Sequence, residues 1–368
     1  MTTLELLPQI VHLHRRPDYG AYSVERVFDT VRRALPPECP VTVEVCPRHS
    51  TGIWNRVHNI ASCTLHRQSI THITGDVHYL ALGLKQSHTI LTIHDTRLLH
   101  ELPMFKRWLF DWLWIRLPIR RCALVTTVSE FSRQEILGAS GCAPHKVRVI
   151  PNPVRDDFRF SPKAFHAERP VLLQVGVGPN KNIERLAHAL KGLNCRLEIV
   201  GRLSPAQRAC FIALGIAVTE LGELGSDEVR EAYARCDVVS FPSTYEGFGL
   251  PVIEGNATGR PVVTGNVASL PEVAGKAACL VDPFDPEAIR QGFVKVFNSP
   301  RYRQELVDQG LRNVERFRAG RIARMYLDLY RELWRGVEGG RLAAEGTTPP
   351  SARSFPSAAA GRTEVRQV

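Results

Sequence analysis

Residues 237–282 read DVVSFPSTYEGFGLPVIEGNATGRPVVTGNVASLPEVAGKAACLVD. An apolar run at 237–241 leads into a glycine-containing loop, and Leu250-Pro251 then opens a helix at 251–258. Two more short apolar runs follow at 262–264 and 279–281. Strands that alternate with helical segments in this way are typical of a parallel sheet, so the stretch predicts an α/β fold.

The same alternation extends over most of the 368 residues. Predicted strands of the first half are 10–14, 41–46, 70–74, 89–94, 123–128 and 147–150. Predicted strands of the second half are 171–175, 197–200, 217–221, 238–241, 262–264 and 279–281. Because single cores rarely grow beyond about 250–300 residues, we expect two Rossmann-like domains that face a cleft.

The polar, proline-bearing stretch 155–170 separates the two halves. We therefore predict an N-terminal domain at 1–160 and a C-terminal domain at 168–320. A helical pattern then predicts a C-terminal helix at 321–336. The remaining residues, 337–368, are rich in Gly, Pro, Ser and Ala, a composition that predicts a disordered tail.

Charge and composition limit the partners. The chain has 47 Lys and Arg against 37 Asp and Glu, a net charge of +10, which suits nucleic acid, an anionic membrane or a phosphate-bearing ligand. No nucleic-acid recognition module is visible, so we predict no nucleic-acid partner. The sequence has neither an apolar run long enough to span a membrane nor a secretory signal, which predicts a cytoplasmic protein. Its nine scattered cysteines predict buried thiols.

The loop and helix start at 246–254 suit a nucleotide sugar. Gly247 and Gly249 allow backbone N–H groups to approach a ligand, and a helix N-terminus favours phosphate. The carboxylates of Glu246 and Glu254, which we place in the loop and in the first helical turn, can accept hydrogen bonds from sugar hydroxyls. Each feature alone is also compatible with an ordinary strand-to-helix turn.

The combined motif resembles the signature of retaining GT-B glycosyltransferases of family 4, the glycosyl transferases group 1 family. It consists of Pro242-Ser243, the E-x7-E pair from Glu246 to Glu254, Gly259-Arg260-Pro261-Val262-Val263, and Ser269-Leu270-Pro271-Glu272-Val273. The resemblance implies that Glu246 contacts the transferred sugar and that Glu254 holds the ribose. It also implies that the backbone amides of four residues line the sugar and diphosphate: Gly247, Phe248, Gly249 and Leu250.

A second matching element is QVGVGPNKN at 174–182. In the family, its lysine neutralises the leaving diphosphate without a metal, which assigns Lys181 to catalysis and, with Gly178, to donor binding. Many members carry an arginine after the strand glycine, but here Val177 follows Gly176. Arg202, after the next strand, lies near the same sheet edge and is our candidate to replace the missing arginine. The alternative is that Arg202 is a solvated surface residue. A dinucleotide fingerprint fails, because a lysine stands where the third glycine is required.

The N-terminal half adds two donor-site candidates. The resemblance assigns Gly20, in the loop after the first strand, to the donor phosphates, and His94, at the end of the fourth strand, to the donor sugar. Ser129 and Asn152 resemble further family elements that we interpret as helix capping and hinge geometry. The sequence shows no cluster of potential metal ligands, so we predict no metal site.

The segment MFKRWLFDWLWIRLPIRR, residues 104–121, combines three tryptophans with five basic residues. Such a composition suits the surface of an anionic membrane, and a core helix with a basic exposed face is the alternative. We therefore expect the protein to lie peripherally on the inner face of the cell membrane.

The resemblance implies a metal-independent, retaining hexosyltransferase. It would move a hexose, with retention, from a nucleotide diphosphate sugar to a saccharide or lipid-linked saccharide acceptor in surface polysaccharide biosynthesis. No cofactor is expected beyond the substrate, and the start of the helix at Lys181-Asn182 favours GDP-mannose through similarity to mannosyl-transferring relatives. The alternatives are a GT-B sugar-nucleotide epimerase and a catalytically silent GT-B subunit.

Overall fold

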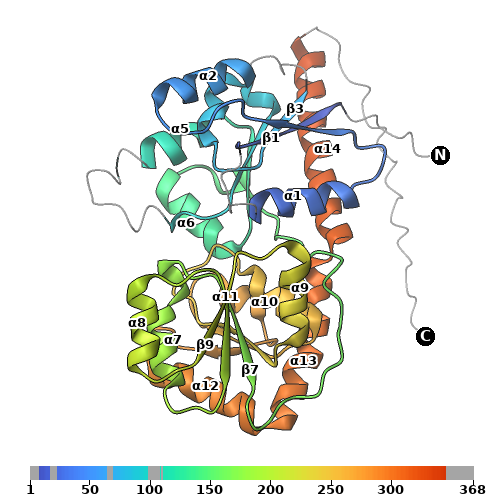
Figure 1. Cartoon of the computed structure of the whole chain (residues 1–368). Coiled ribbons are helices and arrows are strands. Elements are labelled where there is room, and N and C mark those ends of the chain that lie inside the picture. Colours follow the sequence, from blue (N-terminus) through green and yellow to red (C-terminus); the bar gives the residue numbers. More distant parts are fainter. Residues whose placement is uncertain (1–7, 17–22, 64–68, 98–107, 109–110, 345–368) are drawn as a thin grey trace, which may run out of the picture.

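The computed structural model describes residues 8–16, 23–63, 69–97, 108 and 111–344, and contains two parallel six-stranded sheets (Figure 1). The first sheet has the order β2-β1-β3-β4-β5-β6. Its strands are β1 (Ile10–His14), β2 (Val41–Val45), β3 (Ile70–Ile73), β4 (Thr89–Ile93), β5 (Leu124–Thr127) and β6 (Val147–Val149). The helical segments of this half are α1 (Ser23–Ala34), α2 (Ile53–Cys63), η1 (His78–Gly83), η2 (Gln86–His88), η3 (Asp111–Arg116), α5 (Leu117–Arg120), α6 (Glu130–Ser140) and η4 (Pro144–Lys146).

The second sheet has the order β12-β11-β10-β7-β8-β9. Its strands are β7 (Val171–Val175), β8 (Arg196–Val200), β9 (Val218–Gly222), β10 (Val238–Phe241), β11 (Val262–Gly265) and β12 (Cys279–Val281). Its helical segments are η5 (Pro179–Lys181), α7 (Ile183–Leu190), α8 (Pro205–Ala213), α9 (Ser226–Arg235), α10 (Leu250–Thr258), α11 (Leu270–Ala274), α12 (Pro286–Asn298), α13 (Pro300–Val314) and η6 (Glu315–Phe317).

The predicted α/β fold with two Rossmann-like sheets is confirmed, and each predicted strand is present within one residue at either end. The strands are recognisable because helices cover both faces of each sheet, which requires nearly continuous apolar runs. All five residues of β1 and all four of β10 are buried.

Helix α13 is absent from the sequence-based prediction, and its packing explains why. Its contact with α10 is made by Gly310 and Asn313, while Leu306 and Val314 on either side of them are buried in the core. A Cβ at Gly310 would lie 3.1 Å from Nδ2 of Asn256, while the Asn313 amide donates to Asn256 Oδ1 at 3.0 Å. Because glycine and asparagine stand between the two apolar residues of the buried side, the helical periodicity is weak in the sequence.

The last helix, α14 (Ala319–Ala344), leaves the second domain and packs on the first (Figure 1). Its Tyr330 is fully buried against the first sheet, where the side chain contacts His12 and His72. The helix continues past the predicted end at 336, so the beginning of the predicted disordered tail is helical. Residues 345–368 lie outside the described part of the chain.

Candidate active site

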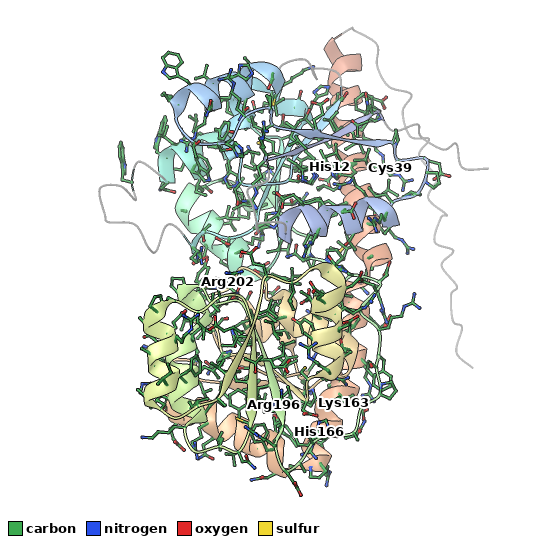
Figure 2. All side chains as sticks on the ribbon, in the orientation of Figure 1. His12, Cys39, Lys163, His166, Arg196 and Arg202 are labelled. Carbon is green, nitrogen blue, oxygen red and sulfur yellow. The ribbon has the colours of Figure 1, made fainter. Side chains whose placement is uncertain are left out.

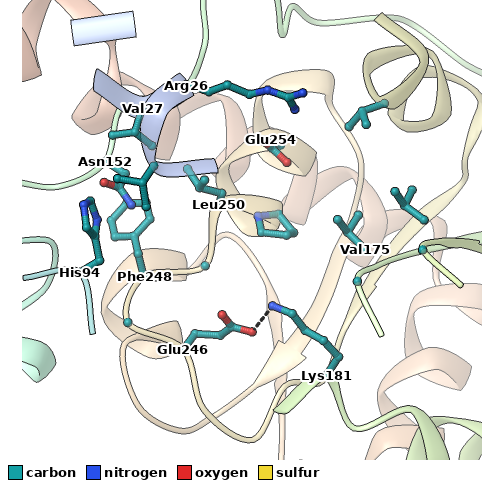
Figure 3. A pocket seen from close by; sticks show the side chains of 18 of the residues that line it. Arg26, Val27, His94, Asn152, Val175, Lys181, Glu246, Phe248, Leu250 and Glu254 are labelled. Atoms are coloured by element: carbon teal, nitrogen blue, oxygen red, sulfur yellow. Dashed lines mark hydrogen bonds and ion pairs between the residues drawn. The ribbon is translucent and has the colours of Figure 1, made fainter. Parts of the chain in front are cut away.

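A cavity of about 900 Å³ lies where the carboxyl ends of the two sheets face each other. The first domain contributes, among others, Arg26, His94 and Asn152 to its lining. The second domain contributes Lys181 and the loop and helix start from Glu246 to Glu254, as Figure 3 shows. Ligand sites of parallel α/β sheets occur at this edge, and the volume is within the range of small-molecule sites.

Lys181 and Glu246 form an ion pair at one side of this cavity (Figure 3). Lys181 Nζ lies 2.6 Å from Glu246 Oε1, and the Asn180 side-chain amide donates to the same oxygen at 3.1 Å. Gly176 allows this geometry, because a Cβ there would be 3.1 Å from Lys181 Cε. The ammonium also lies 4.6 Å from the centre of the Phe241 ring. The sequence predicted both charged residues for the cleft but not their pairing.

The loop that follows Glu246 touches the end of β4 in the other domain. A Cβ at Gly247 would lie 2.3 Å from the carbonyl oxygen of His94, so only glycine fits. Ser129 Oγ donates to the Gly247 carbonyl at 2.7 Å and also caps α6. Nε2 of His94 lies 3.0 Å from the Thr74 carbonyl oxygen, an arrangement that holds the imidazole at the cavity wall.

Helix α10 points its N-terminus toward the cavity. Gly249 provides the left-handed turn before it, with φ of +106°, and the helix begins at Leu250. Glu254 therefore lies in the second helical turn, which corrects the predicted first-turn position. Tyr233 Oη donates to Glu254 Oε2 at 2.7 Å. Burial raises the pKa of Glu254, although Tyr233 and the charge of Arg155 oppose the shift.

Several predicted site residues line this cavity, and others do not. The lining includes His94, Lys181, Glu246, Gly247, Phe248, Gly249, Leu250 and Glu254. Gly178 and Arg202 are not part of it, and Arg202 is exposed at the end of the second domain that faces the first (Figure 2). Arg202 is therefore not brought to the candidate diphosphate site. Gly20 lies outside the described residues.

Val177 is turned away from the cavity. Its side chain packs into the core of the second domain, where a Cβ added to Gly201 would meet both Val177 methyl groups at 3.3 Å. The loop position that carries an arginine in many family members therefore holds an apolar side chain here, and no cation enters the cavity from it.

Two residues of the site, Arg26 and Asn180, were not predicted from the sequence. Arg26 lies near the start of α1, the helix that follows β1, and lines the cavity from the first domain. Its place after the carboxyl end of a parallel strand was a usable signal. Asn180 gave no signal, because its role depends on contacts with both Glu246 and Arg97 of the other domain. Within the described residues, no three His, Cys, Asp or Glu side chains form a group that could hold a metal ion.

Comparison with known proteins agrees with this geometry. Residues 169–299 match the family described as glycosyl transferases group 1, and residues 24–158 match glycosyltransferase family 4. The chain belongs to this glycosyltransferase family. The two matches divide at 158–169, between the two sheets, so each domain matches its own part of the family pattern.

Curated relatives of this family member are distant in sequence and are matched over part of their length. An MMP alpha-(1->4)-mannosyltransferase of Mycolicibacterium hassiacum is 29% identical over 222 residues, which are 57% of this chain and 54% of the relative. The O-antigen chain mannosyltransferase RfbU of Salmonella typhimurium is 27% identical over 48% of this chain and 51% of its own. The serotype-specific mannosyltransferase WbdA of Escherichia coli is 25% identical over 58% of this chain and 29% of its own. The chain thus spans about half or less of these relatives.

Solved structures support the GT-B fold of this family member. Anabaena HepE, in complex with UDP and glucose, superposes with a TM-score of 0.72 at 16% identity, over 88% of this chain and 99% of that chain. WaaG, a glycosyltransferase involved in lipopolysaccharide biosynthesis, superposes with a TM-score of 0.66 at 15% identity, over 88% and 99%. At such identities the likeness concerns the fold alone.

Proposed function

We propose that the protein transfers a hexosyl group, mannose in the first instance, from a nucleotide diphosphate sugar to a saccharide or lipid-linked saccharide acceptor. The observation that carries this proposal is the Lys181–Glu246 pair, which lies in an interdomain cavity opposite His94. A cation, a carboxylate and an imidazole around a nucleotide-sized space suit a reaction in which a diphosphate departs from a sugar.

Each group has a defined task in this reaction. The bond between the anomeric carbon and the diphosphate oxygen breaks, and its electron pair stays on that oxygen, where Lys181 stabilises the new negative charge. The acceptor hydroxyl forms its bond on the same face of the sugar, and its proton passes to the departing diphosphate, so the configuration is retained. Glu246 and His94 hold the sugar, and Glu254 accepts from the ribose hydroxyls. The reaction as proposed needs no metal ion.

The relatives named as mannosyltransferases favour GDP-mannose as the donor. Thermal-shift measurements with GDP-mannose, UDP-glucose and UDP-N-acetylglucosamine test this choice, because a ligand that binds the native state raises its stability by mass action. We expect GDP-mannose to give the largest shift. A larger shift with either UDP sugar would overturn the choice of mannose while leaving glycosyl transfer in place.

Two variants test the site itself. Glu246→Ala and Lys181→Ala should each lower transfer by about 1,000-fold, since each removes a charge that acts on the reacting groups. Circular dichroism should show native folding for both. Lys191→Ala removes an exposed lysine just after α7 and is the matched control. Turnover at the wild-type rate in either site variant would refute the assignment.

Product analysis separates the alternative functions. A transferase releases free nucleoside diphosphate when an acceptor is present, whereas a sugar-nucleotide epimerase returns a nucleotide sugar. A catalytically silent subunit would bind no nucleotide sugar. The silent subunit remains an alternative because of Val177. This apolar residue stands where many family members have an arginine, so the expected diphosphate site has one cation fewer.

We also propose that the first domain docks on an anionic membrane. Within 104–121, Ile115 and Ile119 are buried in the core, whereas Trp108 is 69% exposed and Trp112 and Leu113 are also exposed. Residues 104–107, 109 and 110 lie outside the described residues. Helix α2 adds exposed Ile53, Val57 and Trp54, the last 80% exposed.

Helix α2 adjoins the tryptophan-rich segment, since Arg56 lies 5.1 Å from the ring centre of Trp114. Exposed Arg120 and Arg121 follow this segment and supply positive charge. Tryptophan beside arginine is the combination that an interfacial surface requires. None of the helices in the described part of the chain has the length and apolar character to cross a bilayer.

Sedimentation with vesicles tests this docking. We expect binding to vesicles that contain phosphatidylglycerol, and a loss of at least 10-fold in the double charge reversal Arg120→Glu/Arg121→Glu. Arg301→Glu/Arg312→Glu makes the same charge change on α13 of the other domain and should bind normally. Equal binding by both double variants would refute the docking face and leave the transfer reaction untouched.

A further inference from the structure

The cavity has fewer cations than a nucleotide diphosphate calls for. Its lining includes four carboxylates: Asp95, Glu223, Glu246 and Glu254. Among the described lining residues, Lys181 and Arg26 are the two Lys or Arg side chains. Lys181 is already paired with Glu246 at 2.6 Å. A nucleotide diphosphate brings two negatively charged phosphates into a cavity that already contains four carboxylates. One lysine that is ion-paired with a glutamate does not neutralise this charge, so a second cation is required.

Arg26 enters the cavity from the first domain, on the side opposite the lysine. Figure 3 shows it above Glu254, while Lys181 and Glu246 lie together on the far side. The charge of Arg26 acts on the Glu254 carboxyl, where it opposes the rise in pKa caused by burial. The two cations thus lie beside different glutamates, one at each end of the loop and helix start that line the site.

We propose that Arg26 binds the phosphate nearer the ribose, and that Lys181 binds the phosphate nearer the transferred sugar. This inference rests on the proposed function, in which Glu254 holds the ribose and Glu246 the sugar. A diphosphate between them presents its first phosphate toward Glu254 and its second toward Glu246. Arg26 therefore supplies, from the first domain, the second cation that Val177 does not supply from the second.

The chemistry of arginine suits this role. Its planar guanidinium stays charged and donates two parallel hydrogen bonds to phosphate oxygens. The N-terminus of α10 adds partial positive charge from the other side of the same phosphate. Because Arg26 belongs to the first domain and α10 to the second, a bound phosphate links the two domains. Donor binding and closure of the cleft would then be coupled.

Calorimetric titration with GDP and GMP tests the assignment; UDP and UMP are used if the thermal-shift screen selects a UDP sugar. Arg26→Gln should weaken both the diphosphate and the monophosphate by about 10-fold or more, because each contains the phosphate nearer the ribose. Lys181→Met should weaken the diphosphate and leave the monophosphate nearly unchanged. Arg26→Lys should recover part of the loss, since it keeps the charge but not the paired donors.

Arg33→Gln is the matched control, because it removes the charge of an exposed arginine on the same helix, whose ion pair with Asp29 lies on the surface of α1. It should bind both nucleotides as the wild type does. Wild-type affinity of Arg26→Gln for the monophosphate would overturn the assignment of Arg26 alone. A wild-type protein that binds neither GDP nor UDP would overturn the proposed function, and the inference with it.

Discussion

Acidification should destabilise the contact between α14 and the first sheet, because buried neutral histidines form it. Nδ1 of His72 lies 2.9 Å from Tyr330 Oη, and its Nε2 lies 2.7 Å from Thr92 Oγ1. Burial lowers the pKa of His72 to about 3, with nearby His14 and His94 acting in the same direction. Burial, followed by the charge of Arg32, lowers the pKa of His14 to about 4.

The size of the effect follows from these values. In the unfolded chain both histidines have a pKa of about 6.5, so they become protonated below that pH while the folded protein keeps them neutral. Stability is therefore complete above pH 6.5 and is lost as the pH falls toward 4. At pH 5, each histidine favours unfolding by about 1.36 × 1.5, or about 2 kcal/mol. His14 and His72 together remove about 4 kcal/mol, and His12, with its lowered pKa, adds to the loss.

Urea unfolding at pH 7.5 and pH 5.0, followed by circular dichroism, measures this loss. His72→Asn should be less stable at pH 7.5, because it loses hydrogen bonds, yet its free energy of unfolding should fall on acidification by about 2 kcal/mol less than that of the wild type. His58→Gln, an exposed position on α2, should follow the wild type. If His72→Asn and His14→Gln both lose as much stability on acidification as the wild type does, protonation of these histidines is not the cause of the acid-induced loss of stability.

Three further substitutions test the cavity and the contacts that surround it. Gly247→Ala places a Cβ 2.3 Å from the His94 carbonyl oxygen, so the cleft cannot close and kcat should fall at least 10-fold, whereas Gly336→Ala, at an exposed position of α14 with open space around it, should not slow turnover. Glu272→Gln weakens the capping of α6 across the domains, where Glu272 now accepts from the Glu130 amide at 2.9 Å; small-angle scattering should record a more open average shape. Tyr233→Phe removes the donor to Glu254 and should weaken nucleotide binding several-fold without a change in kcat; a fall in kcat instead would contradict the ribose assignment.

The sequence predicts the architecture well, because parallel strands buried on both faces appear as short apolar runs. It also predicts the loop at the site, because the glycines that this loop requires are part of a recognisable motif. Gly249 is required by the left-handed turn before α10, a local constraint that appears in the motif. Gly247 appears in the same motif, although what requires it is its close approach to His94 of the other domain. The Glu246–Lys181 pair could be placed at one sheet edge for the same reason, since both follow strands that are neighbours in the sheet.

Features that depend on contacts between distant segments could not be predicted. Arg26 follows the carboxyl end of β1, which placed it near the sheet edge, but its entry into the cavity beside Glu254 depends on how the two sheets face each other. Arg202 follows a strand in the predicted manner, and Val200 and Gly201 just before it line the cavity, but its own side chain is exposed and is not part of the lining. The exposed Trp54 of α2 also escaped notice, since one tryptophan in a helix is more often a core residue than a surface one.

The connections between the domains differ in kind on the two sides of the cavity. At the back, the two chain crossings are hydrogen-bonded to each other, with Val154 N donating to Phe317 O at 2.8 Å, and α14 continues from there into the first domain. Tyr330 of that helix is buried among aromatic rings of the first sheet and α1, so separation here would expose a large apolar area.

The front of the cavity is joined chiefly by polar contacts. Ser129 binds the Gly247 carbonyl at 2.7 Å, and Glu272 caps α6. Such bonds exchange for bonds to water at a net cost of about 1 kcal/mol each, far less than the exposure of α14 would cost. We therefore expect the cleft to open at Gly247 and to pivot near Val154 and Phe317, with α14 moving as part of the first domain. A donor phosphate bound between Arg26 and α10 would close the cleft about the same hinge, because Arg26 and α10 lie on opposite sides of the cleft.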